Sequence, residues 1–222
     1  MTQPEALGPV GILGGTGPLG RALGVRFARA GLSVALGSRD AERAATIAAE
    51  LATPGLVGVD NPTAARCPIV LVAVPYEGHA ALLAGLADTL ADRLVIDCVN
   101  PLGFDKRGPY ALAVPAGSAA EEAAELLPRS RVIAAFHHLS APLVADESVT
   151  SLDCDVLVLG EDRDDVAIGQ ALAEHLPGVR GHYAGRLRNA GQVEALTANL
   201  IAINRRYRAH SGIRVTGLEQ PR

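Results

Sequence analysis

A glycine-rich turn between an apolar run and an amphipathic segment limits what this chain can fold into. The stretch VGILGGTGPLGRALGVRFARAG at 10–31 contains the pattern GxGxxG at Gly15, Gly17 and Gly20. The apolar run before the pattern predicts a strand, and the helical spacing of apolar residues after it predicts a helix that ends at Gly31. A strand, a glycine turn and a helix in this order are typical of a βαβ dinucleotide-binding unit.

The alternation of strand and helix continues through the first hundred residues. The hydrophobic pattern predicts strands at 32–38, 56–59, 69–75 and 93–101 and helices at 40–52 and 78–91. The run IVLVAVP at 69–75 is apolar throughout, as in a strand that is covered by helices on both faces. Short connections between alternating elements predict a doubly wound, parallel α/β sheet of the Rossmann type.

The second half of the chain is less regular. Residues 103–117 are rich in Gly and Pro and are predicted to form a loop, while strands are expected at 131–140 and 154–161 and helices at 118–128, 163–178 and 189–208. A chain of 222 residues is long enough for one large domain with a small appendage. We therefore expect a nucleotide-binding domain at 8–145 and a small C-terminal α/β segment at 146–222.

Composition excludes several classes of protein. The net charge of −4 argues against a nucleic-acid-binding protein. The three cysteines have no metal-ligand spacing, and Cys98 and Cys154 lie in apolar runs that predict burial. The first ten residues, MTQPEALGPV, lack the pattern of a signal peptide, and the longest apolar run, IVLVAV, is far too short to span a membrane. We expect a cytoplasmic protein with no metal site and no membrane part.

Each glycine of the turn has a predicted task in binding a dinucleotide. Gly15 would permit the tight turn, Gly17 would let a pyrophosphate approach the backbone, and Gly20 would let the helix lie close to the strand. The N–H groups and positive dipole end at the helix start would then bind the phosphates. The alternative is that the glycines serve packing alone.

The end of the second predicted strand indicates which dinucleotide is bound. NAD-binding proteins of this type carry an acidic residue there for the ribose 2′-OH, whereas this chain has Ser38 and Arg39, with Arg43 one turn into the next helix. Arg guanidinium groups bind phosphate well, so the pattern favours the 2′-phosphate of NADP. Asp40 is interpreted as the cap of the following helix, with a ribose contact as the alternative.

The sequence lacks the acid–base groups of several dehydrogenase classes. The C-terminal segment is too short for the helical substrate domain of β-hydroxyacid dehydrogenases, and the only lysine, Lys106, lies in the predicted loop rather than on a helix. No YxxxK pattern of the short-chain dehydrogenases occurs. An enzyme without such groups can still pass hydride between two cofactors, because aligning their rings accounts for most of the catalysis.

Several stretches carry a resemblance to one family. They are GILGGTGPLGRAL (11–23), GSRDAERA (37–44), VAVPYEGH (72–79), CVNPL (98–102), AAFHHLSAPL (134–143), DVLVLGED (155–162) and GRLRNAGQVEALTANLIAINRRYRAHSGI (185–213). From about Val10 to Leu218 the chain resembles the NADPH-dependent reductases of coenzyme F420, a deazaflavin. The His-containing stretch and the last helix are the more specific carriers, because the first two stretches also occur in other Rossmann proteins.

The resemblance implies a function and a set of contacts. It implies direct hydride exchange between the nicotinamide C4 and the deazaflavin C5, in a cleft between the Rossmann domain and the C-terminal segment, and a homodimer. It implies NADP contacts within the glycine turn and at the ends of strands, namely at Thr16, Gly17, Pro18, Leu19, Ser38, Arg39, Arg43, Val74, Asn100 and Ala141.

For each of three groups of residues the sequence leaves two interpretations open. His137 and His138 either touch the deazaflavin carbonyls or make structural hydrogen bonds. The arginines of the C-terminal segment either attract the phosphate and glutamates of the deazaflavin tail or are simply solvated. The apolar stripe Leu196, Leu200 and Ile203 is core or dimer contact.

The sequence leaves two rival functions open. One is an NADPH-dependent flavin or ferric reductase on the same scaffold, a class whose membrane metalloreductase members share the GSR pattern. The other is a regulator that senses NADP without turning it over.

Overall fold

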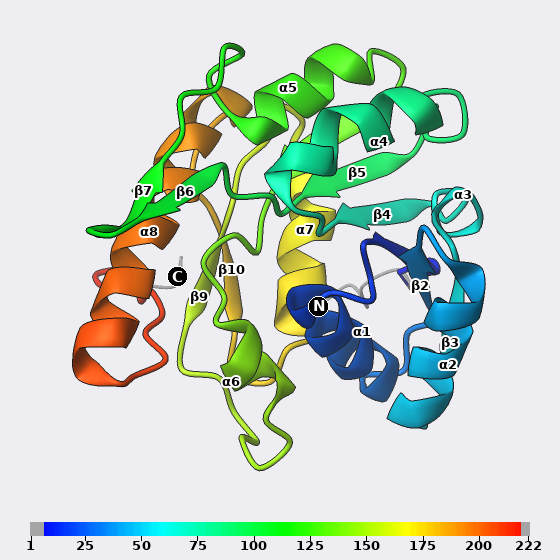
Figure 1. Ribbon diagram of the computed structural model, residues 1–222, viewed down its shortest axis with the longest axis horizontal. Helices are drawn as coiled ribbons and strands as arrows, with labels where there is room; N and C mark the ends of the chain where they lie inside the picture. The colour runs from blue at the N-terminus through cyan, green and yellow to red at the C-terminus, as the bar shows by residue number, and fades with distance from the viewer. Residues whose placement is uncertain (1–6, 219–222) are drawn as a thin grey trace.

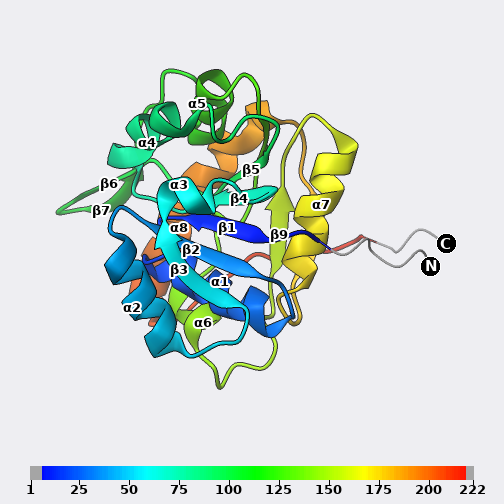
Figure 2. The same cartoon turned by 90° about the vertical axis from the view of Figure 1, so that its right-hand side faces the viewer.

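A six-stranded parallel sheet forms the centre of the molecule in the computed structural model, which describes residues 7–218 (Figures 1 and 2). The sheet has the order β3-β2-β1-β4-β5-β8. Its strands are β1 (Val10–Leu13), β2 (Val34–Ser38), β3 (Leu56–Asp60), β4 (Ile69–Val72), β5 (Leu94–Asp97) and β8 (Arg131–Ala134). The predicted doubly wound α/β sheet is therefore confirmed. Strand order reverses beside β1, where ligands bind in sheets of this type.

Helices cover both faces of the sheet. They are α1 (Pro18–Arg29), α2 (Ala41–Leu51), α3 (Asn61–Ala64), α4 (His79–Leu86), α5 (Ala119–Leu126), α6 (Ala141–Ala145), α7 (Arg163–Glu174) and α8 (Ala190–Tyr207), with 3-10 turns η1 (Tyr76–Gly78) and η2 (Leu187–Asn189). One core joins the sheet to α1, α6 and α7, and the other joins it to α3, α4 and α5. A third, smaller core packs α8 and η2 against α5 and the ends of β8 and of a further strand, β9 (Asp155–Val158).

Side-chain caps fix where several helices begin. Asp40 precedes α2, and its carboxylate accepts a hydrogen bond from the backbone N–H of Arg43 at 3.0 Å. This confirms the interpretation of Asp40 as a helix cap. Ser118 and Asp162 cap α5 and α7 in the same way.

A second, two-stranded sheet follows the main one. It consists of β9 (Asp155–Val158) and β10 (Arg180–Tyr183), which run parallel and are connected by α7. An antiparallel bridge between Ala134 and Leu159 ties this sheet to the end of β8. The strand predicted at 154–161 thus exists in shorter form, while β10 was not predicted.

The predicted loop at 103–117 is wrong in its first part. Residues there form a hairpin of β6 (Leu102–Asp105) and β7 (Gly108–Ala111), and β7 packs on α8 (Figure 1). Asp105 accepts a hydrogen bond from the N–H of Arg107 at 2.7 Å, and Gly108 has φ 120°. A side-chain-stabilised turn followed by a glycine closes a hairpin well, so the Gly and Pro content of this stretch marked a tight turn rather than a loop.

The strand predicted at 131–140 is longer than the strand in the structure. β8 ends at Ala134, and Phe136 takes a positive φ of 66° with its ring packed edge-on against Phe27. The chain therefore turns before it reaches the two histidines, which lie beyond the strand end.

No helix in residues 7–218 is long and apolar enough to cross a membrane. Of the N-terminal stretch considered for a signal peptide, residues 1–6 lie outside the described part of the chain.

Candidate functional site

A hollow of about 620 Å³ lies at the carboxyl ends of β1, β2 and β4, and we refer to it as the nucleotide groove. It is lined by Gly14, Thr16, Gly17, Ser38, Arg39, Asp40, Arg43, Asn61, Ala73, Val74, Pro75, Glu77, Gly78 and Leu82. Six residues predicted to contact NADP share this groove, although the chain spreads them over residues 16–74. A groove at the switch point of a doubly wound sheet is where a dinucleotide binds.

The glycine turn is built differently from the prediction at one position. The residue with left-handed backbone is Gly14, with φ 72°, and not Gly15. Gly15 is required for close packing instead, because a Cβ there would lie 2.8 Å from the Cα of Leu36 in β2. Gly20 packs just as closely, since its Cβ would lie 2.7 Å from the Cα of Gly15.

Gly17 is the glycine whose missing side chain leaves room for a ligand. A Cβ at this position would have only two backbone oxygens within 4 Å, those of Gly14 at 3.2 Å and Ala73 at 3.9 Å. Its φ of −76° is available to any residue. The packing requirement at Gly17 is therefore weaker than at Gly15 and Gly20, and Gly17 lines the nucleotide groove, where close approach of a pyrophosphate favours a glycine.

Asn61 was missed by the sequence analysis. It follows β3 directly, is buried, and its Oδ1 accepts a hydrogen bond from the N–H of Gly14 at 3.3 Å. Its position as a polar residue immediately after a parallel strand, at the edge where ligands bind, is the signal that could have identified it. Its side chain holds the glycine turn against the third strand.

The rim of the nucleotide groove carries two arginines. Arg39 and Arg43 are exposed, and among the described residues neither guanidinium forms an ion pair. Ser38 is buried, and its hydroxyl accepts a hydrogen bond from the N–H of Asp40 at 3.2 Å. Because Asp40 is occupied with capping α2, the two guanidiniums are left to face the groove.

A second hollow of about 650 Å³ lies between the Rossmann sheet and α8, and we refer to it as the α8 cleft. It is lined by Leu19, Asn100, His137, His138, Leu139, Ser140, Ala141, Pro142, Thr197, Leu200, Ile201, Asn204, Arg205, Arg208, Ala209, His210 and Ser211. Of the residues predicted to bind NADP, Leu19, Asn100 and Ala141 lie here. Pro18 lines a smaller, apolar hollow between α1 and α6.

The two histidines differ in their surroundings. His137 is 2% exposed, and neither of its ring nitrogens has a hydrogen-bond partner among the described residues. His138 is equally buried, but its Nε2 accepts a hydrogen bond from the N–H of Leu157 at 3.4 Å. A structural hydrogen bond is thus found for His138 and not for His137. Unpaired buried nitrogens that border a cavity are suited to a ligand's polar groups.

Both histidines are neutral at pH 7. Burial lowers the pKa of His137 below its usual value. For His138, burial and the neighbouring His137 lower the pKa to about 4. A neutral imidazole can donate one hydrogen bond and accept another, so His137 offers the cleft a polar group without a charge.

A short chain of hydrogen bonds fixes the wall of the cleft. The amide nitrogen of Asn100 donates to the carbonyl of His137 at 2.8 Å. The hydroxyl of Thr197 on α8 lies 3.2 Å from the same carbonyl and 3.3 Å from Asn100 Oδ1. Asn100 therefore positions the His137 loop and α8 against each other, a role that was not predicted.

A buried cluster of ionisable groups lies behind this wall. His79 is fully buried, and its Nε2 and Nδ1 lie 2.7 Å from Asp97 and 2.8 Å from Glu122. Burial alone would lower the pKa of His79, but the two carboxylates outweigh it and raise that pKa above the usual value. His79 thereby links α4, β5 and α5.

Glu194 brings α8 into the same cluster. Its carboxylate accepts hydrogen bonds from the N–H groups of Ala119 at 3.0 Å and Ala120 at 3.2 Å, at the start of α5. Burial raises the pKa of Glu194 to about 7, against the effect of these two donors. A carboxylate at a helix N-terminus is favoured by unpaired N–H groups and by the dipole. Glu194 therefore anchors α8 on the Rossmann domain.

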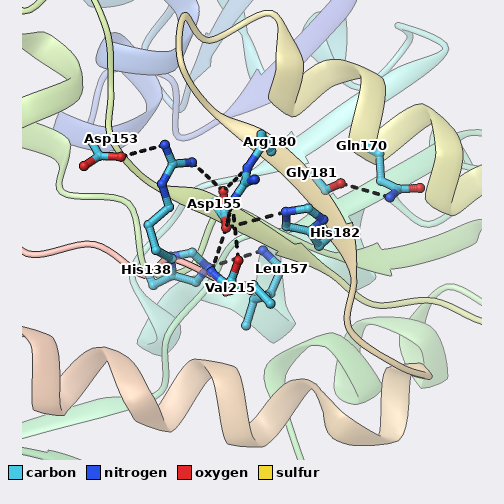
Figure 3. A network of polar contacts seen from close by, with 10 residues as sticks. His138, Asp153, Asp155, Leu157, Gln170, Arg180, Gly181, His182 and Val215 are labelled. Carbon is cyan, nitrogen blue, oxygen red and sulfur yellow. Dashed lines mark hydrogen bonds and ion pairs between the residues drawn. The ribbon is translucent and has the colours of Figure 1, made fainter. Parts of the chain in front are cut away.

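The segment after α8 is fastened to the second sheet by Asp155 (Figure 3). This buried carboxylate lies 2.8 Å from both Arg180 and Arg214 and accepts a hydrogen bond from the N–H of Val215 at 2.7 Å. Burial alone would raise the pKa of Asp155, but the arginines and this N–H hold it well below its usual range. The far wall of the α8 cleft, Ala209 to Ser211, is thereby tied to β9.

Comparison with known proteins gives a consistent set of matches. Residues 9–101 match the family model described as NADP oxidoreductase, coenzyme F420-dependent. The F420-dependent NADP reductase of Methanothermobacter thermautotrophicus is 37% identical over 95% of this chain and 96% of that protein. The rat metalloreductase STEAP3 is 33% identical, over 62% of this chain and 26% of that protein.

A solved structure shows the same fold. A protein from Arthrobacter sp. FB24, described as a candidate F420-dependent NADP-reductase, superposes with a TM-score of 0.79 and 22% identity, over 94% of this chain and 99% of that one. At this identity the superposition supports the fold alone.

Proposed function

The chain belongs to the family of coenzyme F420-dependent NADP oxidoreductases, and we propose that it transfers hydride directly between NADP(H) and the deazaflavin coenzyme F420. One observation in the structure supports this above the others. Two hollows of cofactor size flank the start of α1, with Gly17 lining the nucleotide groove and Leu19 lining the α8 cleft. A site that aligns two ring systems needs this arrangement.

The nucleotide groove fits NADP. Its glycine turn leaves room for a pyrophosphate at Gly17, and Ser38, Arg39 and Arg43 supply a hydroxyl and two guanidiniums for the 2′-phosphate. Thr16 and Val74 line the same groove. This set of contacts is a proposal drawn from the position of the residues around one hollow.

The α8 cleft fits a deazaflavin ring. Apolar side chains such as Leu139, Leu200 and Ile201 line it, and the buried, neutral His137 borders it with two ring nitrogens that have no hydrogen-bond partner among the described residues. Hydride would pass between the nicotinamide C4 and the deazaflavin C5, and a proton from solvent would balance the reduction. The residues of the chain would bind both rings, hold their faces at reacting distance and exclude water. His137 would orient the deazaflavin through a hydrogen bond to its carbonyl region.

The chain would then divide its tasks between two parts. Residues 8–145 would bind NADP, and 146–222 would complete the deazaflavin cleft, as the lining of the α8 cleft by both parts suggests. We also propose a homodimer, because exposed apolar side chains gather on the hairpin and α8, at Phe104, Tyr110, Ile203 and Tyr207. A cytoplasmic location is proposed on the three cysteines, which form no disulfide in the described chain.

The second candidate is an NADPH-dependent flavin or ferric reductase, which the partial match to STEAP3 favours. Mixing the protein with NADPH and either F420 or FMN, and following the absorbance of each acceptor, separates the two functions. We expect reduction of F420 to be far faster than that of FMN. Comparable rates would favour the second candidate, and binding of NADPH without reduction of any acceptor would indicate an NADP sensor.

A further inference from the structure

The exposed end of the α8 cleft carries positive charge, although the chain as a whole has a net charge of −4. Arg205, Arg208 and His210 line this end, and no Asp or Glu is among the described residues that line the cleft. The buried end, in contrast, is lined by neutral groups such as Asn100 and Thr197. A cleft with this polarity suits a ligand with a neutral ring at one end and negative charge at the other.

The two guanidiniums are available for binding and are held in place. Within residues 7–218 neither Arg205 nor Arg208 forms an ion pair. The guanidinium of Arg205 lies over the ring of Phe104, 5.7 Å from its centroid. This cation–π contact comes from the β6–β7 hairpin and limits where the side chain can lie.

Arg208 occupies a backbone conformation that few residues with side chains adopt. Its φ of 52° and ψ of 48° end α8 in the left-handed region. Asn204 supports this turn, because its carbonyl accepts a hydrogen bond from Ala209 N–H at 3.2 Å and its Oδ1 accepts one from Ser211 N–H at 2.6 Å. The turn holds Arg208 and His210 at the exposed end of the cleft.

We propose that Arg205 and Arg208 form a subsite for the anionic tail of the deazaflavin, and so select the phosphate- and glutamate-bearing coenzyme over the bare deazaflavin. This inference rests on the proposed function. Guanidinium groups bind carboxylates and phosphates through paired, charge-assisted hydrogen bonds. Since both side chains are exposed, the attraction is weakened by salt.

The test compares two acceptors with the full-length protein and NADPH. One is coenzyme F420 with its tail, and the other is the same deazaflavin without the phosphate and glutamates. The measured quantity is the ratio of kcat/KM for the tailed acceptor to kcat/KM for the tailless one. We expect Arg205→Ala and Arg208→Ala each to lower this ratio about tenfold, as the loss of one charge-assisted hydrogen bond would. High ionic strength should lower the ratio in the wild type.

Arg206→Ala is the matched control. Arg206 is exposed on the same helix but is not among the residues that line the cleft, so its replacement should leave the ratio unchanged. An unchanged ratio in the Arg205 and Arg208 variants, or an equal fall in the Arg206 variant, would overturn the tail subsite while leaving hydride transfer intact. Failure of the wild type to reduce either acceptor would overturn the proposed function itself.

Discussion

At the scale of single residues, the nucleotide groove shows how one sequence motif combines folding and binding. Gly14 supplies a left-handed backbone, Gly15 and Gly20 permit close packing, and Gly17 has the weakest packing requirement of the four. The GxGxxG pattern predicted the groove because close approach and tight packing both exclude a Cβ. It misplaced the left-handed residue by one, since the pattern itself does not reveal which glycine has positive φ.

The preference for NADP over NAD is a prediction at this scale. Arg39→Ala or Arg43→Ala should raise the KM for NADP about tenfold, because each removes a charge-assisted hydrogen bond of about 1.5 kcal/mol to the 2′-phosphate. The KM for NAD should barely change, since NAD lacks that phosphate. Steady-state kinetics with both nucleotides measures the difference.

Arg29→Ala provides the control for general effects of losing an arginine. Arg29 is exposed, lies on α1 away from the nucleotide groove and pairs with Glu147 at 2.7 Å. It should leave both constants unchanged. If KM for NADP and KM for NAD rose together in the Arg39 or Arg43 variant, these arginines would be supporting the loop rather than distinguishing the nucleotides.

At the scale of elements, the sequence predicted the strands and helices whose burial imposes a clear hydrophobic pattern. The strands of the main sheet and the helices after them were found because both faces of a parallel sheet are covered. The β6–β7 hairpin and β10 were not found, because both are short and partly exposed and so lack a clear apolar pattern. His137 and His138 were assigned to a strand end for a different reason: the turn at Phe136 depends on tertiary packing, which the local hydrophobic pattern does not reveal.

Contacts between elements were beyond the sequence altogether. His79, Asp97, Glu122 and Glu194 come from four different elements and meet in one buried cluster. Nothing in their sequence spacing brings them together. The cluster fixes α8 on the Rossmann domain, so the position of the α8 cleft depends on residues that do not border it.

This anchoring predicts a pH dependence of stability. The pKa of Glu194 is raised from 4.5 to about 7 in the folded protein, so the fold holds a proton that the unfolded chain has lost between these values. Folding stability therefore falls as pH rises through this range. Glu194→Gln should remove that loss of stability, which is on the order of 3 kcal/mol because each pKa unit corresponds to about 1.36 kcal/mol. The free energy of unfolding of the variant should therefore rise relative to that of the wild type as pH rises from about 4.5 to about 7.

Urea unfolding at several pH values measures this effect, and Glu125→Gln is its control. Glu125 lies on α5, as do the N–H groups that Glu194 contacts, but it is exposed. Because Glu125 lies outside the buried cluster, its replacement should not reproduce the gain in stability expected of Glu194→Gln. A pH-independent difference between wild type and Glu194→Gln would show that Glu194 stays ionised in the fold.

At the scale of the whole molecule, the chain closes its second cleft with its own C-terminal segment. The segment leaves α8 at Arg208, follows the edge of the cleft and joins β9, where Asp155 N–H donates to the carbonyl of Ile213 at 2.7 Å. The sequence indicated that both parts of the chain form the site, through the resemblance. It did not indicate how residues 209–215 are held, because Asp155, Arg180 and Arg214 are separated by long stretches of chain.

Asp155→Asn should therefore destabilise the whole molecule and loosen the cleft wall. The change leaves Arg180 and Arg214, which are both partly exposed, without the charge that they bind, and the loss of a hydrogen bond to a charged group costs about 2 kcal/mol. Because the pKa of Asp155 is lowered by folding, its contribution is present above the unfolded value of 3.8 and is lost as pH falls below it. Chemical denaturation at pH 7 measures the loss of stability, and amide hydrogen exchange at residues 209–215 measures the loosening of the cleft wall.

Asp153→Asn is the control, since Asp153 also pairs with Arg214 but is 86% exposed, and such surface pairs contribute little. If Asp155→Asn lowered stability without faster exchange at 209–215, Asp155 would hold β9 and β10 together rather than fasten the segment that closes the cleft.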